Sequence, residues 1–132
     1  MVSQDTRKEL EESLGRVPSF VEALAPAAAD HSWGIMRDLE LGETELSHRE
    51  KALVAIGAAS AMQCQYCIHF HREEARLHGV SDDEVGEAAN VAATVRYFSS
   101  VLHGAEMDLD EFEAETAAIM DHVRTHQQPA DD

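Results

Sequence analysis

Positive charge is scarce in this 132-residue chain. Ten Lys and Arg residues face 26 Asp and Glu residues, which gives a formal net charge of −16, and the only lysines are Lys8 and Lys51. Nucleic acids and anionic membranes need a basic surface on the protein that binds them, so we expect neither as a partner. An acid-rich, lysine-poor surface keeps a protein soluble, and it is also the kind of surface that halophilic proteins use.

Long apolar runs are also missing. No stretch approaches the roughly 20 consecutive apolar residues of a transmembrane helix. The first residues, Met1 to Asp5, lack the basic region and apolar core of a signal peptide. We therefore expect a cytoplasmic protein.

Aromatic and turn-forming residues are few. The sequence has seven glycines, three prolines and 5% aromatic residues, whereas alanine is abundant. This composition favours packed helices with short connections over a many-turned β-sandwich. We predict an all-α protein with one domain over residues 1–132, in which about 127–132 form a disordered tail.

Capping signals divide the chain into helices. We expect helices over 5–14, from residue 19 onward with Pro26 starting or interrupting the segment, from 47 to about 62, over 64–78, over 81–104, and from 108 or 110 to about 126. Ser47 with Glu50, and Ser81 with Glu84, have the form of capping boxes. A break near Met62 would place Cys64 in the first turn of a new helix, where the helix dipole stabilises a thiolate.

The two cysteines lie in a C-x-x-C motif that is followed by His71. On a helix, Cys67 lies about 60° and His71 about 20° from Cys64 around the axis, so the three share a face. Two thiols beside an imidazole suit thiol-disulfide or peroxide chemistry, because the thiolate is the nucleophile. A structural disulfide is the least favoured reading, because its loop is too short to constrain much unfolded-chain entropy.

Two other readings of the motif remain open. Cys64, Cys67 and His71 are also three ligands for a zinc ion, with His69, His103 or Glu50 as a fourth, although zinc pairs usually lie on a knuckle or turn. Alternatively, the cysteines pack as small hydrophobic residues in a catalytically quiet helical assembly. Glu73 and Glu74, one turn past the motif, are expected to lie on a solvated helix face.

The order of these motifs resembles a known family. The motifs are Leu46-Ser47-x-x-Glu50-Lys51, an alanine-rich helix, Cys64-Gln65-Tyr66-Cys67-Ile68-x-x-His71, Gly79, and the later run Ser99-Ser100-Val101-Leu102-His103-Gly104. Together they resemble the AhpD-like alkylhydroperoxidase branch of the carboxymuconolactone decarboxylase family. The resemblance covers roughly residues 17–123.

The resemblance implies an all-α subunit in a homo-oligomer, a trimer or hexamer, that reduces hydroperoxides. By this likeness Cys67 attacks the peroxide, Cys64 resolves it as a disulfide, and His71 is the base, with an unknown thiol or dithiol as electron donor. We expect no cofactor. Decarboxylation is less favoured, because the lactone decarboxylases that resemble this fold do not rely on a C-x-x-C pair.

Two assignments within the resemblance stay open. The best-known members carry an acid for the proton relay twelve residues before the first cysteine, where this chain has Ala52, and Glu50 lies fourteen before it. We include Glu50 with Cys64, Cys67 and His71 as the candidate catalytic residues. In many C-x-x-C proteins the first cysteine is the more reactive, whereas the resemblance gives the attack to Cys67.

Overall fold

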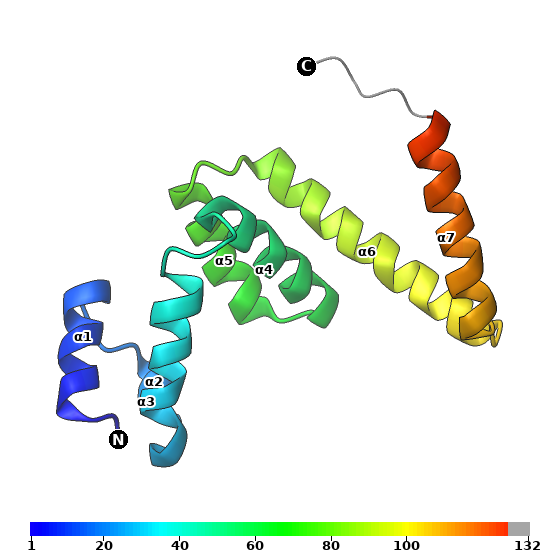
Figure 1. The fold of residues 1–132 in the computed structure, drawn as a ribbon. Helices are drawn as coiled ribbons and strands as arrows, with labels where there is room; N and C mark the ends of the chain where they lie inside the picture. The colour runs from blue at the N-terminus through cyan, green and yellow to red at the C-terminus, as the bar shows by residue number, and fades with distance from the viewer. Residues whose placement is uncertain (127–132) are drawn as a thin grey trace. The chain divides into compact units, whose positions relative to one another are not determined.

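The computed structural model describes residues 1–126, and these residues contain helices and no β-strand (Figure 1). The helices are α1 (Gln4–Leu14), α2 (Ser19–Glu22), α3 (Pro26–Ile35), the π-helix η1 (Met36–Glu40), α4 (His48–Met62), α5 (Gln65–Leu77), α6 (Asp82–Gly104) and α7 (Leu109–His126). The all-α prediction is confirmed. The predicted tail at 127–132 lies outside the described residues.

Local sequence signals account for most helix ends. Gly15 ends α1 in the left-handed conformation, and Pro26 starts α3 at its first turn, where its missing N–H costs nothing. Both predicted capping boxes are present: Ser47 with Glu50 at α4, and Ser81 with Glu84 at α6.

The chain divides into two compact units, residues 1–89 and 90–132, and α6 runs across the division. The first unit holds two apolar clusters. One joins α1, α2 and α3 around Leu10, Val21 and Trp33. The other joins α4, α5 and the start of α6, and consists of Ala52, Ile56, Ala75, Val80 and Val85. Trp33 is buried and its indole N–H donates to Glu9 at 2.7 Å.

The second unit, as far as residue 126, has no buried side chain. Large apolar residues on α6 and α7 are exposed there, among them Val95, Phe98 and Ile119. No helix within residues 1–126 has both the length and the apolar character needed to cross a membrane. A single domain over residues 1–132 stays a prediction.

Helices α4 and α5 form the frame of the candidate site. Gln63 adopts a left-handed conformation (φ 57°) and ends α4, and Cys64 is extended, so the chain reverses between the two helices. At the other end, the rings of His48 and His78 stack with their centroids 4.9 Å apart, so the start of α4 lies beside the end of α5. The two helices are therefore antiparallel.

Candidate active site

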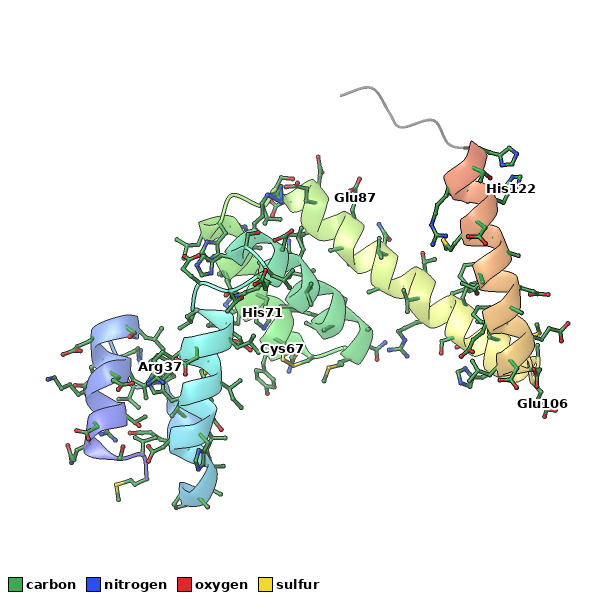
Figure 2. The ribbon with its side chains drawn as sticks, in the orientation of Figure 1. Arg37, Cys67, His71, Glu87, Glu106 and His122 are labelled. Atoms are coloured by element: carbon green, nitrogen blue, oxygen red, sulfur yellow. A yellow bond between two sulfur atoms is a disulfide. The ribbon has the colours of Figure 1, made fainter. Side chains whose placement is uncertain are left out.

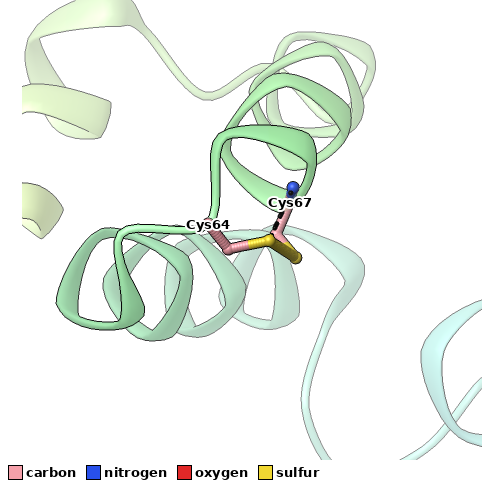
Figure 3. Close-up of a disulfide and its surroundings, with 2 residues drawn as sticks. All are labelled: Cys64 and Cys67. Carbon is pink, nitrogen blue, oxygen red and sulfur yellow. Dashed lines mark hydrogen bonds between the residues drawn. A yellow bond between two sulfur atoms is a disulfide. The ribbon is translucent and has the colours of Figure 1, made fainter.

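The two cysteines are joined by a disulfide at the start of α5 (Figure 3). Cys64 is the N-cap residue, and the backbone N–H of Cys67 donates to the sulfur of Cys64 at 3.3 Å. The predicted break before Cys64 is thus confirmed. The unpaired N–H groups of this first turn stabilise negative charge, so they favour the thiolate once the disulfide is reduced.

His71 follows Cys67 by about one turn of α5 (Figure 2). Its Nδ1 lies 2.7 Å from Oε2 of Glu74, and the two side chains are only 18% and 15% exposed. An ionised carboxylate only accepts hydrogen bonds, so Nδ1 is the nitrogen that donates to Glu74, and in the neutral ring Nε2 then holds the lone pair. Nε2 is therefore the ring nitrogen that can act as a base.

The structure corrects one sequence expectation about the acids that follow the motif. Glu73 is exposed, as predicted, but Glu74 is mostly covered and holds His71. The signal was available in the sequence, because residues three apart are neighbours on a helix surface. A carboxylate three residues beyond the histidine can reach its ring.

A pocket of about 630 Å³ lies beside Cys67, His71 and Glu74. Its wall combines one face of α4 with the segment 39–46, which begins in the last two residues of η1. Apolar side chains make up most of this wall: Leu39, Leu46, Val54, Ala55, Ala58, Ala59 and Met62. Cys67 lines the pocket, whereas Cys64 is not among its lining residues.

Lys51 fastens the segment 39–46 to α4. Its ammonium group donates to the carbonyl oxygens of Leu39 and Gly42, each at 2.7 Å. A Cβ at Gly42 would lie 2.5 Å from the carbonyl oxygen of Asp38, so only glycine fits where the chain leaves the π-helix. Neither Lys51 nor η1 was assigned a role from the sequence.

Glu50 lies away from the cysteines. It is exposed on the first turn of α4, and the backbone N–H of Ser47 donates to its Oε2 at 2.7 Å. This hydrogen bond holds the pKa of the Glu50 carboxyl below its ordinary value. Because α4 and α5 are antiparallel, Glu50 lies near the end of α5, while the cysteines lie at its start. Glu50 does not line the pocket.

Three of the four predicted site residues are thus brought together on the first two turns of α5, and Glu50 is not. In this structure the sulfurs of Cys64 and Cys67 are joined as a disulfide, and zinc binding by the reduced thiols with His71 stays an alternative prediction. Within residues 1–126, no group of three or more His, Cys, Asp or Glu side chains is placed to hold a metal ion.

The fold and the site define an all-helical protein with a C-x-x-C disulfide at the N-terminus of a core helix. The sequence profile of the carboxymuconolactone decarboxylase family matches residues 18–107. The chain therefore belongs to this family.

The chain is also similar to two other proteins. "Uncharacterized protein 4 in cox locus" of Paracoccus denitrificans is 31% identical over 79 residues, which are 60% of this chain and 71% of that protein. A crystal structure of a protein from Methanobacterium thermoautotrophicum is 32% identical, with a TM-score of 0.56 over 67% of this chain and 97% of that one.

The fold is also that of a named enzyme. The crystal structure of the alkylhydroperoxidase AhpD core from Rhodospirillum rubrum has a TM-score of 0.71 and 18% identity, and covers 84% of this chain and 85% of that one. At this identity the likeness concerns the fold. The predicted AhpD-like member of the carboxymuconolactone decarboxylase family is confirmed at the level of family and fold.

Proposed function

We propose that the protein is a thiol-dependent peroxidase of the alkylhydroperoxidase type, which reduces hydroperoxides through a Cys64–Cys67 dithiol/disulfide cycle. One observation carries the proposal: Cys67 and His71 line the same apolar pocket, and Cys67 is bonded to Cys64 at a helix N-terminus. Nucleophile, base and resolving thiol therefore lie within one short helix segment.

The first step is attack of the Cys67 thiolate on the terminal oxygen of a hydroperoxide. The O–O bond breaks, Cys67 becomes a sulfenic acid, and the alkoxide takes a proton to leave as an alcohol. His71 Nε2 accepts the thiol proton of Cys67 and returns it to the leaving oxygen. That Cys67, and not Cys64, lines the pocket supports Cys67 as the attacking residue.

The second step closes the disulfide. The thiol of Cys64 attacks the sulfenic sulfur of Cys67, and water leaves. The Cα atoms of the two cysteines are 5.3 Å apart, a separation that disulfides require. Two thiols, or one dithiol, from an external donor then reduce the disulfide and leave as the oxidised donor.

In this proposal Glu74 is the positioning residue for His71. Its carboxylate fixes the tautomer of the ring and stabilises the imidazolium that forms when Nε2 takes the proton. A relay role for Glu50 stays a prediction, and its carboxylate is already hydrogen-bonded to Ser47.

Thiol counting after a brief treatment with peroxide tests the cycle. Fully reduced protein should lose both alkylatable cysteines and gain no oxygen. In Cys64→Ser, Cys67 should instead stop at the sulfenic acid, which a dimedone probe captures. Two alkylatable cysteines remaining in the treated wild-type protein, after denaturation, would rule the cycle out.

A further inference from the structure

The residues that line the pocket beside Cys67 indicate which class of substrate it binds. Its walls from α4 and from the segment 39–46 are predominantly apolar, and its volume of about 630 Å³ lies within the range of small-molecule sites. An apolar organic group attached to the reacting oxygen or sulfur would therefore be bound by removal of its surface from water.

The charged residues of the same pocket are mostly acidic. Three carboxylates line it: Glu74 beside His71, and Glu40 and Glu45, both exposed, on the segment 39–46. A ligand must pass the field of the two exposed glutamates, and the net charge of −16 adds to the same field.

No lining group offers a free cation to a bound anion. Lys51 is the only lysine or arginine among the lining residues, and its ammonium already donates to the carbonyl oxygens of Leu39 and Gly42. The ring of His71 is held by Glu74. An anion in this pocket would meet carboxylates and apolar side chains, and would lose its hydration without a compensating ion pair.

We propose that the pocket selects neutral apolar hydroperoxides and disfavours anionic ones, with Glu40 and Glu45 as the residues that set this charge preference. The proposal rests on the peroxidase function proposed above. It extends to the second half of the cycle, because a reducing thiol that attacks Cys67 enters through the same pocket. Neutral thiols should therefore reduce the disulfide faster than anionic thiols.

A matched pair of substrates tests the preference. Linoleic acid hydroperoxide and its methyl ester carry the same apolar tail and differ in one negative charge. Below their micellar concentrations and at low salt, we expect kcat/KM for the ester to exceed that for the acid by roughly five- to thirtyfold, and added salt to narrow the gap. Equal values of kcat/KM would overturn the proposal.

Substitutions of Glu40 and Glu45 test whether these two residues set the charge preference. The double variant Glu40→Gln/Glu45→Gln should raise kcat/KM for the acid relative to that for the ester, and so bring the ratio closer to one than in the wild type. Glu43→Gln is the matched control, since Glu43 lies in the same segment, is 93% exposed at its side chain and does not line the pocket. A ratio that the double variant leaves unchanged would contradict the assignment.

A second arm separates this proposal from the peroxidase function. The Cys64–Cys67 disulfide is reduced with 2-mercaptoethanol or with mercaptoacetate, and each rate is divided by the rate of the same thiol with a small neutral disulfide. We expect the neutral thiol to be favoured several-fold, and the double variant to reduce the difference. If neither hydroperoxide is consumed, the peroxidase function fails and this arm alone decides whether the pocket selects by charge; equal normalised rates then reject the selection.

Discussion

At the scale of single residues, the chemistry of Cys67 depends on how much of its thiol is ionised near neutral pH. A free cysteine has a pKa near about 8.5, so only a few per cent is thiolate at pH 7 without help. In the proposed mechanism two features of α5 supply that help: the N–H groups of its first turn and the ring of His71, whose Nδ1 is bound to Glu74.

The first prediction separates these two contributions. His71→Ala should slow the peroxide-driven oxidation of Cys67 at pH 7 by about tenfold or more, and much less at pH 9, where hydroxide generates the thiolate. Stopped-flow rates of thiol loss across this pH range measure the effect. A pH-rate profile identical to that of wild type would leave the helix N-terminus as the only activator.

The second prediction concerns which carboxylate positions His71 and stabilises its imidazolium. Glu74→Gln should lower the oxidation rate at pH 7 by about three- to tenfold, because the amide cannot stabilise the imidazolium by charge. The loss should shrink at pH 9, which a merely structural defect would not reproduce.

Glu50→Gln is the matched comparison for Glu74→Gln, since it removes the same charge from the neighbouring helix. With its carboxylate bound to Ser47, Glu50 should be replaceable with less than about a twofold change in rate. A larger loss of oxidation rate in Glu50→Gln than in Glu74→Gln would show that Glu50, and not Glu74, is the acid that assists His71.

At the scale of helices, the sequence predicts ends better than it predicts contacts. Gly15, Ser47 and Ser81 act on their own helix within one turn, so their effect can be read locally. The break before Cys64 was predictable for the same reason. The π-helix was not, because an apolar stripe over 33–39 does not distinguish an α-helix from a π-helix.

Contacts across α4 and α5 depend on the reversal at Gln63. Glu50 could meet the cysteines only if the chain turned between α4 and α5, and the chain does turn there. However, the two helices are antiparallel, so the start of α4, with Glu50, lies beside the end of α5 and not beside the cysteines. Ala52 and Ile56 of α4 and Ala75 of α5 belong to one buried cluster, and alanine-rich faces do not specify the register of such packing in the sequence.

The third prediction concerns the pocket wall. Lys51→Met removes the two hydrogen bonds that hold the segment 39–46, and should cost about 1.5 kcal/mol of local stability, or roughly tenfold faster amide exchange there. Hydrogen exchange detected by mass spectrometry measures it. Lys8→Met, at an exposed position of α1, is the control and should leave the segment unchanged. Equal exchange in Lys51→Met and wild type would contradict the prediction.

The fourth prediction follows from the capping box of α4. Because folding lowers the pKa of Glu50, its charge stabilises the folded state above the ordinary value of 4.5, and that contribution is lost as pH falls through the lower, folded pKa. Glu50→Gln should therefore lower the thermal midpoint at pH 7, and its difference from wild type should shrink as the pH falls below 4.5. A difference that grows toward low pH would have the wrong sign.

At the scale of the whole molecule, exposed apolar side chains favour self-association and a large negative charge opposes it. Val91, Val95 and Phe98 on α6 and Leu109 and Ile119 on α7 are each more than half exposed. A surface of this kind is usually covered by another chain, and copies of one chain form closed assemblies most readily. The net charge of −16 opposes such association at low ionic strength.

The fifth prediction is therefore a homo-oligomer, a trimer or hexamer, whose mass rises or holds with added salt. Light scattering coupled to gel filtration, at low and at high salt, measures it. Val95→Glu, which places a further charge on the exposed face of α6, should reduce the mass. A monomeric mass at high salt would contradict the prediction.

In the proposed cycle, Cys67 reduces the peroxide and Cys64 is its resolving partner. Consumption of cumene hydroperoxide in the presence of dithiothreitol, by wild-type protein and by Cys67→Ser, tests this role of Cys67. We predict sustained turnover by the wild type and a rate no greater than that of dithiothreitol alone for Cys67→Ser. Equal rates for the two proteins would contradict this role.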